Sequence, residues 1–160
     1  MGRYRVKLNL GASNRRFDGF LSVDIVEPAD IVADLTKPWP WPDSSVDEVV
    51  AFDVFEHLPD KRHTMNELWR CLKPGAHATI QVPHATDGDG GHCDPTHCSY
   101  WTTSDFEYYC PGTAEWDRFH TSSYYGIKCA FRMVQITQNK HQRSFGGHVV
   151  EIMAVIEAVK

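Results

Sequence analysis

The chain has 160 residues, 42% of them hydrophobic and 23% charged, and its formal net charge is −5. This length is typical of one domain with a sizeable core, so we expect a single domain over residues 1–160. No apolar run approaches the ~18 residues of a membrane span. The acidic balance also argues against non-specific binding to nucleic acid or to an anionic membrane, because both need a basic surface.

The start of the chain and its cysteines indicate a cytoplasmic protein. The first residues lead directly into a strand pattern, so we expect no secretory signal peptide. The five cysteines are odd in number and follow no framework spacing, which suits a reducing compartment better than a disulfide scaffold.

The first half of the chain predicts an α/β fold with a mostly parallel sheet. Short apolar runs alternate with turns, and they predict strands at residues 6–10, 21–25, 30–33, 48–52 and 78–82, the last ended by Pro83. Near-continuous apolar strands are typical of a parallel sheet covered on both faces. Residues 11–20 are too few for a regular helical crossover, so the first connection is expected to be a loop or a single helical turn.

One helix is predicted between the fourth and fifth strands. Its apolar face has helical spacing and consists of Met65, Leu68, Trp69 and Leu72. Pro59 and Asp60 mark its start, and the Lys-Pro-Gly sequence at 73–75 marks its end.

The second half predicts a lid followed by two strands. Residues 84–125 are rich in glycine, histidine and aromatic residues, as long functional loops often are. A capping box at 104–107 is expected to open a short helix through Tyr109. Residues 130–138 and 148–159 are expected to pair as antiparallel strands that close the sheet. Aromatic residues of the lid either wall a substrate pocket or form a satellite core, namely Tyr100, Trp101, Phe106, Tyr108, Tyr109 and Trp116.

Two strand ends carry residues suited to a nucleoside. Gly11 follows the first strand, where a glycine lets a ligand approach the backbone. Asp24 ends the second strand, where an acidic side chain can accept bonds from a ribose diol. Ser13 stands where a dinucleotide motif has its second glycine, so phosphate binding and a dinucleotide-dependent oxidoreductase are disfavoured. Asp34, after the third strand, could accept a bond from an adenine amino group, or it is a cap or turn residue.

Further motifs in the same order complete a family resemblance. Leu-Asn-Leu-Gly at 8–11, Ser-Val-Asp-Glu at 45–48, Glu-His-Leu at 56–58 and Leu-Lys-Pro-Gly at 72–75 are each weak alone, but their order and spacing are specific. Over about residues 6–83 the sequence resembles the class I S-adenosylmethionine (SAM)-dependent methyltransferases, of the small type called methyltransferase type 11. The stretches 94–97 and 100–102, and the closing strands, are also similar to such proteins.

The resemblance implies a Rossmann-like three-layer sandwich with a mostly parallel seven-stranded sheet and an antiparallel last strand. It implies that SAM lies across the carboxyl ends of the strands. Carried over by position, Gly11, Ala12 and Ser13 would approach its methionine moiety, Asp24 would bind the ribose and Ile25 would pack near the adenine. Asp34 and Leu35 would flank the adenine, and Phe52, Asp53 and Val54 would lie beside the sulfonium.

Methyl transfer needs an aligned nucleophile and sometimes a base. His57, His84 and His97 are the candidate catalytic residues, each with a structural alternative. The expected function is methyl transfer from SAM to a small-molecule or sugar acceptor. The alternative is a non-catalytic SAM- or nucleoside-binding module that regulates a partner.

Two residue clusters receive a structural interpretation. The loop residues His92, Cys93, Asp94, His97 and Cys98 are of zinc-ligand type, with His120, His141 or His148 available to complete a site. Because the loop lacks the C-x-x-C spacing of zinc sites, lid packing is preferred and no metal is expected. The only basic concentration, Arg3, Arg5, Lys7, Arg15 and Arg16, is interpreted as a solvated face.

Overall fold

A computed structural model describes residues 5–119, 125–144 and 146–160 of the chain. Arg3 and His120 lie outside these described residues. The strands are β1 (Lys7–Leu10), β2 (Leu21–Asp24), β3 (Ile31–Val32), β4 (Val46–Phe52), β5 (Leu72–Gly88), β6 (Phe131–Gln142) and β7 (His148–Ala158). The helices are the 3-10 turn η1 (Phe55–His57), α1 (Lys61–Cys71), α2 (Thr103–Glu107) and α3 (Ala114–Phe119).

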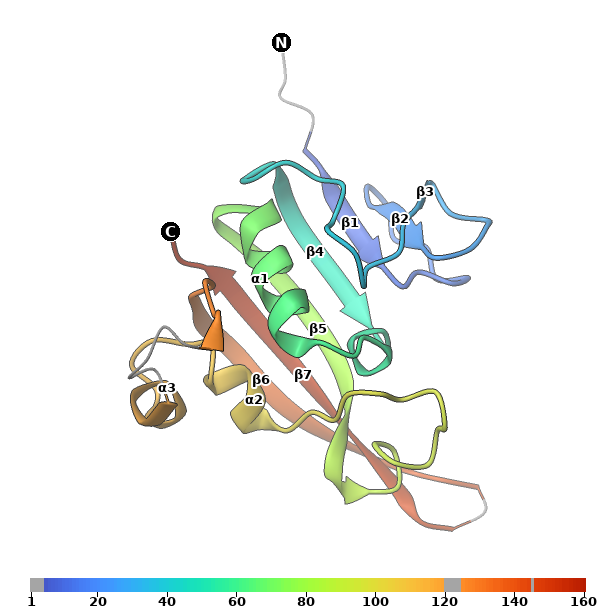
Figure 1. Cartoon of the computed structure of the whole chain (residues 1–160). Helices are drawn as coiled ribbons and strands as arrows, with labels where there is room; N and C mark the ends of the chain where they lie inside the picture. Colours follow the sequence, from blue (N-terminus) through green and yellow to red (C-terminus); the bar gives the residue numbers. More distant parts are fainter. Residues whose placement is uncertain (1–4, 120–124, 145) are drawn as a thin grey trace.

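The strands form one seven-stranded sheet in the order β3-β2-β1-β4-β5-β7-β6 (Figure 1). The first five strands pair in parallel, whereas β7 is antiparallel to both β5 and β6. The predicted Rossmann-like sheet with antiparallel closing strands is therefore confirmed. Leu10 of β1 lies opposite both Val23 and Ala51, so β1, β2 and β4 end at the same edge of the sheet.

The core lies on one face of this sheet, under α1. Alternate residues of the central strands point to this face and are buried, including Leu8, Leu10, Val49, Ala51, Ala78, Ile80, Ile152, Ala154 and Ile156. Met65 and Leu68 of α1 pack on them, which confirms the amphipathic helix. Each fully buried aliphatic side chain of this kind stabilises the fold by about 1.5–3 kcal/mol.

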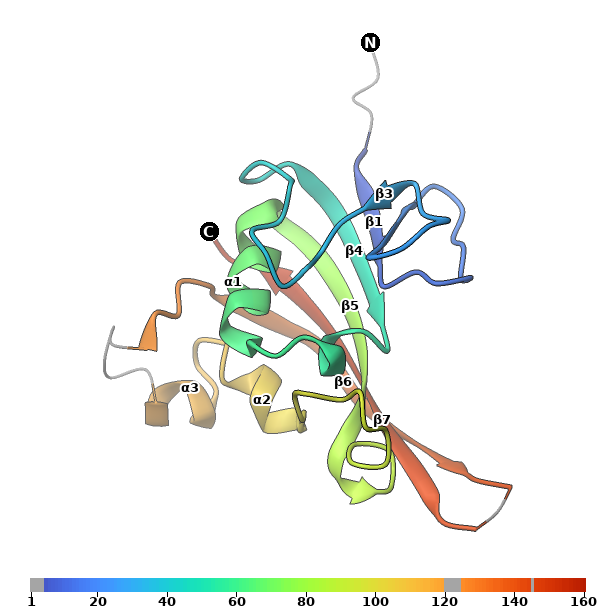
Figure 2. The ribbon, with the colours of Figure 1, turned by 45° about the vertical axis from the view of Figure 1, so that its right-hand side comes forward.

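The described helices all lie on that same side of the sheet (Figures 1 and 2). The three-layer arrangement is therefore not formed by helices in the described part of the chain. The connections before β4 contain no helix, and residues 11–20 form turns and irregular segments, in line with the prediction of a loop. On the opposite face, Phe17 of this loop packs edge-on against Phe52 at 5.8 Å between ring centroids, and Lys7 pairs with Glu48 at 2.6 Å.

The fifth strand is longer than predicted at both ends. Strand β5 begins at Leu72, which was expected to belong to the helix, and it does not stop at Pro83 but continues to Gly88. The Gln81 carbonyl, on the β4 side of β5, accepts a bond from the Asp53 amide just after β4. The backbone nitrogen of Pro83, two residues later, faces the same side, but β4 has already ended there. A missing N–H there removes no ladder bond.

The capping box is also displaced from its predicted position. Helix α2 begins at Thr103, and Thr102 precedes it. The Asp105 carboxylate accepts bonds from the Thr102 amide at 2.7 Å and from its hydroxyl at 2.8 Å. Among the described residues, no helix has the length and apolar character needed to cross a bilayer.

The close approach of β1 to the turn after β4 gives a first prediction. Gly11 has φ +63°, and a Cβ built there would lie 2.5 Å from Cβ of Val54. Gly75 has a similar φ of +74° with open space around it. We expect Gly75→Ala to destabilise the fold by about 1 kcal/mol through backbone strain alone. Gly11→Ala should cost about 1–3 kcal/mol more, because it adds overpacking.

Urea unfolding of the two variants measures this difference. Equal losses for both would show that Val54 yields without cost, and that the crowding at Gly11 does not constrain the fold.

Candidate functional site

A cavity of about 170 Å³ lies at the carboxyl ends of β1, β2 and β3, closed by the turn after β4. Its lining consists of Gly11, Asp24, Ile25, Ala33, Asp34, Leu35, Thr36, Val54, His57 and Leu58. Most of the residues proposed for SAM by position thus share one cavity. Parallel strands deliver this clustering, because their carboxyl ends meet at one sheet edge.

The Asp24 carboxylate bonds to the backbone of two loops, the one after β1 and the one after β2. Its Oδ2 accepts a bond from the Ser13 amide at 2.8 Å, and its Oδ1 accepts one from the Ile25 amide at 2.7 Å. Each carboxylate oxygen has a second acceptor site, so a diol can still bind. Ile25 is 63% exposed at the rim of the cavity, an apolar side chain available to a planar ligand.

Ala12 and Ser13 do not line this cavity. Ala12 is buried, and its amide donates to the Val23 carbonyl at 3.0 Å. Ser13, at φ +44°, lies in an adjoining hollow of about 190 Å³ that it shares with Asp24.

Asp34 has the turn role that was its alternative interpretation. Its Oδ1 accepts bonds from the Thr36 hydroxyl at 2.6 Å and the Thr36 amide at 2.9 Å. These bonds hold the pKa of Asp34 below its usual value. The residue nevertheless lines the cavity, beside buried Leu35.

Asp53 is held in a strained position directly after β4. Its φ is +56°, a region that non-glycine residues rarely adopt. Its Oδ2 pairs with Arg15 at 2.6 Å, and its Oδ1 accepts a bond from the Gln81 amide group at 3.2 Å. The interpretation of Arg15 as part of a solvated face missed this contact. Phe52 points the other way, toward Phe17.

A second cavity of about 290 Å³ adjoins the first, and His57 lines both. Its lining consists of Asp53, Glu56, His57, Pro83, Gly90, Cys93, Asp94, His97, Arg143, Val149 and Glu151. It lies between the end of β4 and the segment that follows β5.

The structure brings together two of the three candidate histidines. The rings of His57 and His97 have centroids 4.9 Å apart and meet edge-on. His84 lines neither of these cavities. Its Nδ1 accepts bonds from the amides of Thr86 and Asp87, so its ring is bound to the local backbone.

Glu56 is the residue that the sequence analysis did not single out. It is 2% exposed, and its Oε2 has no hydrogen-bond partner in the described structure. Burial, with the negative charges of Asp53 and Asp94, raises its pKa to about 8. The available signal was its place in the Glu-His-Leu motif, but nothing in the sequence showed that the carboxyl would be buried.

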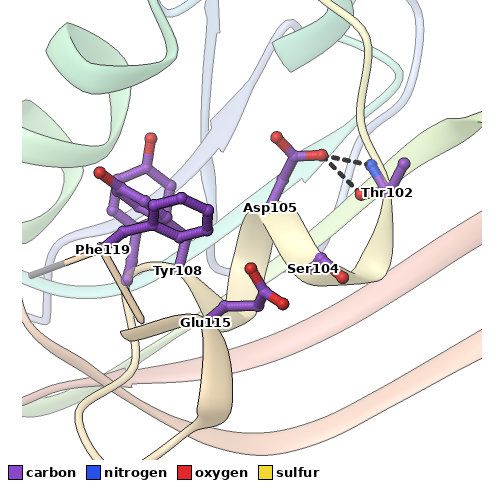
Figure 3. Close-up of a pocket in the computed structure, with 7 residues that line it drawn as sticks. Thr102, Ser104, Asp105, Tyr108, Glu115 and Phe119 are labelled. Atoms are coloured by element: carbon purple, nitrogen blue, oxygen red, sulfur yellow. Dashed lines mark hydrogen bonds between the residues drawn. The ribbon is translucent and has the colours of Figure 1, made fainter. Parts of the chain in front are cut away.

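The lid aromatics belong mostly to the core. Trp101, Phe106 and Tyr109 are buried in the main cluster. The nearby hollow of about 300 Å³ lies at α2 and α3 rather than at the strand ends (Figure 3). It has two lining carboxylates, of which Asp105 is already bonded to Thr102 and to Lys61, and Glu115 belongs to α3, away from the strand ends. We therefore assign this hollow no part in the site.

The crowded loop does not assemble the zinc site considered from its sequence. His92 stacks on Tyr100 with centroids 4.2 Å apart, and Cys93 accepts a bond from Arg143. Of this loop, His97 alone belongs to a group of three potential metal ligands within the described residues.

Comparison with known proteins gives a consistent class. Residues 12–80 match the family described as a methyltransferase domain. A protein of Mycolicibacterium smegmatis named probable S-adenosylmethionine-dependent methyltransferase is 39% identical over 56 residues, or 35% of this chain. Those residues are 22% of that protein, so the chain spans less than a quarter of the curated relative it matches.

Fold similarity covers nearly the whole chain. A SAM-dependent methyltransferase of Methanosarcina mazei has a TM-score of 0.64 at 11% identity, covering 99% of this chain and 94% of that one. Phosphoethanolamine N-methyltransferase 2 of Haemonchus contortus, solved with S-adenosyl-L-methionine, has a TM-score of 0.56 at 13% identity, covering 100% and 49%. Residues 12–80 thus resemble SAM-dependent methyltransferases in sequence, as predicted, and the solved structures show that the whole chain shares their fold.

The buried carboxyl of Glu56 predicts a pH-dependent stability. A pKa of about 8 in the folded state, against 4.5 for the ordinary group, means that the folded protein holds this proton more tightly. Its contribution is present below pH 4.5 and is lost as the pH rises toward 8. At pH 8, Glu56→Gln should therefore stabilise the metal-free protein by roughly 4–5 kcal/mol, at about 1.4 kcal/mol per pH unit.

Urea unfolding in chelator-treated buffer at pH 5 and pH 8 checks this expectation. The gain should be several-fold larger at pH 8. A gain that is the same at both values would mean that the Glu56 carboxyl is not desolvated. Glu67→Gln is a control of opposite sign, because the bond to Arg70 lowers the pKa of Glu67.

Proposed function

We propose that the protein is a SAM-dependent methyltransferase that acts in the cytoplasm on a small-molecule or sugar acceptor. The observation that carries the proposal is the single cavity that unites Gly11, Asp24 and Asp34 at three strand ends. The cytoplasmic assignment is supported by the five cysteines, which are all free.

The donor set of the cavity suits SAM. Ribose hydroxyls and an adenine amino group are hydrogen-bond donors, and Asp24 and Asp34 offer acceptors. Ile25, Leu35 and Val54 offer apolar contact for the adenine. Asp53 lines the adjoining second cavity rather than this one, and its negative charge is already paired with Arg15.

SAM supplies an activated methyl group on a sulfonium, and the protein must align an acceptor with it. We assign the acceptor to the second cavity for two reasons. His57 lines both cavities, and the volume of the second cavity suits a small molecule. His57 Nδ1 lies 3.2 Å from both the carbonyl and the hydroxyl of Thr96, and with a proton on Nδ1 the Nε2 atom is able to accept one. Phe52, Ala12 and His84 line neither of these cavities, so we assign them no contact with SAM or the acceptor.

Binding of SAM and S-adenosylhomocysteine tests the proposal. Calorimetric titration of the ligand-free protein should show micromolar binding of both ligands. Asp24→Asn should weaken it by at least about tenfold, since one or more charge-assisted bonds of roughly 1.5–3 kcal/mol are lost. Asp18→Ala is the matched control, because Asp18 is exposed on the preceding loop and lines neither cavity.

Failure of the folded wild-type chain to bind either ligand would contradict the proposal. Binding without methyl transfer to any of a panel of hydroxyl, amine and thiol acceptors would instead favour the non-catalytic SAM-binding module.

A further inference from the structure

Three potential metal ligands converge at the junction of the two cavities. Potential ligand atoms of Glu56, His57 and His97 all lie within 4.8 Å of one another. They come from two distant segments, since η1 follows β4 whereas His97 follows β5. The Glu56 carbonyl joins the segments by accepting bonds from the amides of Cys98 and Ser99, both at 2.9 Å.

The proton arrangement of the two histidines leaves a ligand nitrogen free on each. His57 Nδ1 lies 3.2 Å from the Thr96 carbonyl, and His97 Nδ1 lies 3.0 Å from the Gly91 carbonyl. Because a carbonyl oxygen only accepts, each bond requires a proton on Nδ1. Each Nε2 then carries a lone pair. Histidine ligands of metals are typically oriented in this way, with the second ring nitrogen bonded to a backbone carbonyl.

The carboxyl of Glu56 supplies the second, independent observation. It is 2% exposed, yet its Oε2 has no hydrogen-bond partner within the described residues. A buried polar oxygen without a partner is rare and destabilises the folded state. The two imidazoles offer ligand atoms close to the same carboxyl group, and a cation held between the three residues would give the buried carboxyl a partner.

We propose that Glu56, His57 and His97 bind one divalent transition-metal cation of the zinc, cobalt or iron(II) class. Two imidazoles and one carboxylate are a ligand set that these metals accept, with positions left open for other ligands. Ligand atoms bound at 2.0–2.1 Å lie about 3.3 Å apart in a tetrahedral site, so the three groups draw together when the metal binds.

The charges around the three ligands favour a cation. Asp53, Asp94 and Glu151 line the same cavity, and the positive charges beside them are Arg143 of the lining and Arg15, which pairs with Asp53. Asp94 Oδ2 lies 3.8 Å from His97 Nε2, close enough to become a further ligand or an outer-shell partner. The open coordination positions face the 290 Å³ cavity. An acceptor that carries a hydroxyl or carboxylate oxygen is the class that such a cation would hold there, and this last step rests on the proposed function.

The test is zinc binding without SAM, which keeps it separate from the proposed function. Exposed Cys93 and Cys98 can bind zinc on their own, so the background protein carries Cys93→Ser and Cys98→Ser. After chelator treatment, calorimetry with Zn²⁺ should give one site per chain. His57→Ala, His97→Ala and Glu56→Gln should each weaken it by at least about 100-fold. His84→Ala and His92→Ala are matched controls and should leave it unchanged.

Cobalt supplies a readout that does not depend on stability. Co²⁺ bound to the background protein should show the intense visible absorption of a low-coordinate site, and this absorption should be lost in His97→Ala. Absence of stoichiometric zinc binding would overturn the proposal. Binding that survives His57→Ala and His97→Ala, or that disappears in His92→Ala, would also overturn it, because the metal would then be held elsewhere.

Discussion

The site depends on one pair of backbone hydrogen bonds, from the amides of Cys98 and Ser99 to the carbonyl of Glu56. They fasten the segment after β5 to the turn after β4, and Ser99 reinforces them by donating from its hydroxyl to the Phe55 carbonyl. Trp101 donates to Ser99 in turn and is buried beside Phe55. A buried aromatic pair thus anchors an otherwise irregular loop, and His97 is delivered to His57 as a consequence.

A second constraint acts where β1 and β4 end. Position 11 requires glycine for two reasons: its positive φ, and the lack of space for a Cβ beside Val54. Asp53 also adopts a positive φ, which is strained for a non-glycine residue. Strain at strand ends is common where backbone and side chains are arranged for a ligand. The Arg15–Asp53 pair compensates part of this arrangement across the first loop, but it is exposed and contributes at most about 1 kcal/mol. Packing at Val54, rather than this ion pair, therefore holds the two ends together.

Sequence reasoning predicted the features that follow from periodicity and strand ends. The parallel order places Gly11, Asp24 and Asp34 at one edge whatever the side chains do, so their shared cavity was predictable. Features that depend on long-range contacts were not. Glu56 is buried by the loop that carries Cys98 and Ser99, which is distant in the sequence. The bonds of His84 depend on the path that β5 takes beyond Pro83. The sequence predicted that residues 11–20 form a loop rather than a helix. It did not predict that the opposite face of the sheet would lack a layer of helices.

That missing layer bears on what the first cavity can bind. A helix that follows the first strand of such a sheet directs its N-terminal amides and positive dipole end at the ligand, and this is the usual phosphate site. The loop at 11–20 offers no such helix. The carboxylates that line this cavity are those of Asp24 and Asp34, and they repel a phosphate. A nucleoside without a phosphate does not need a helix N-terminus, and a positive charge on it is attracted by the carboxylates. SAM, with its sulfonium, is such a molecule. The same local change that removes a helix thus narrows the ligand from nucleotides in general to a cationic nucleoside.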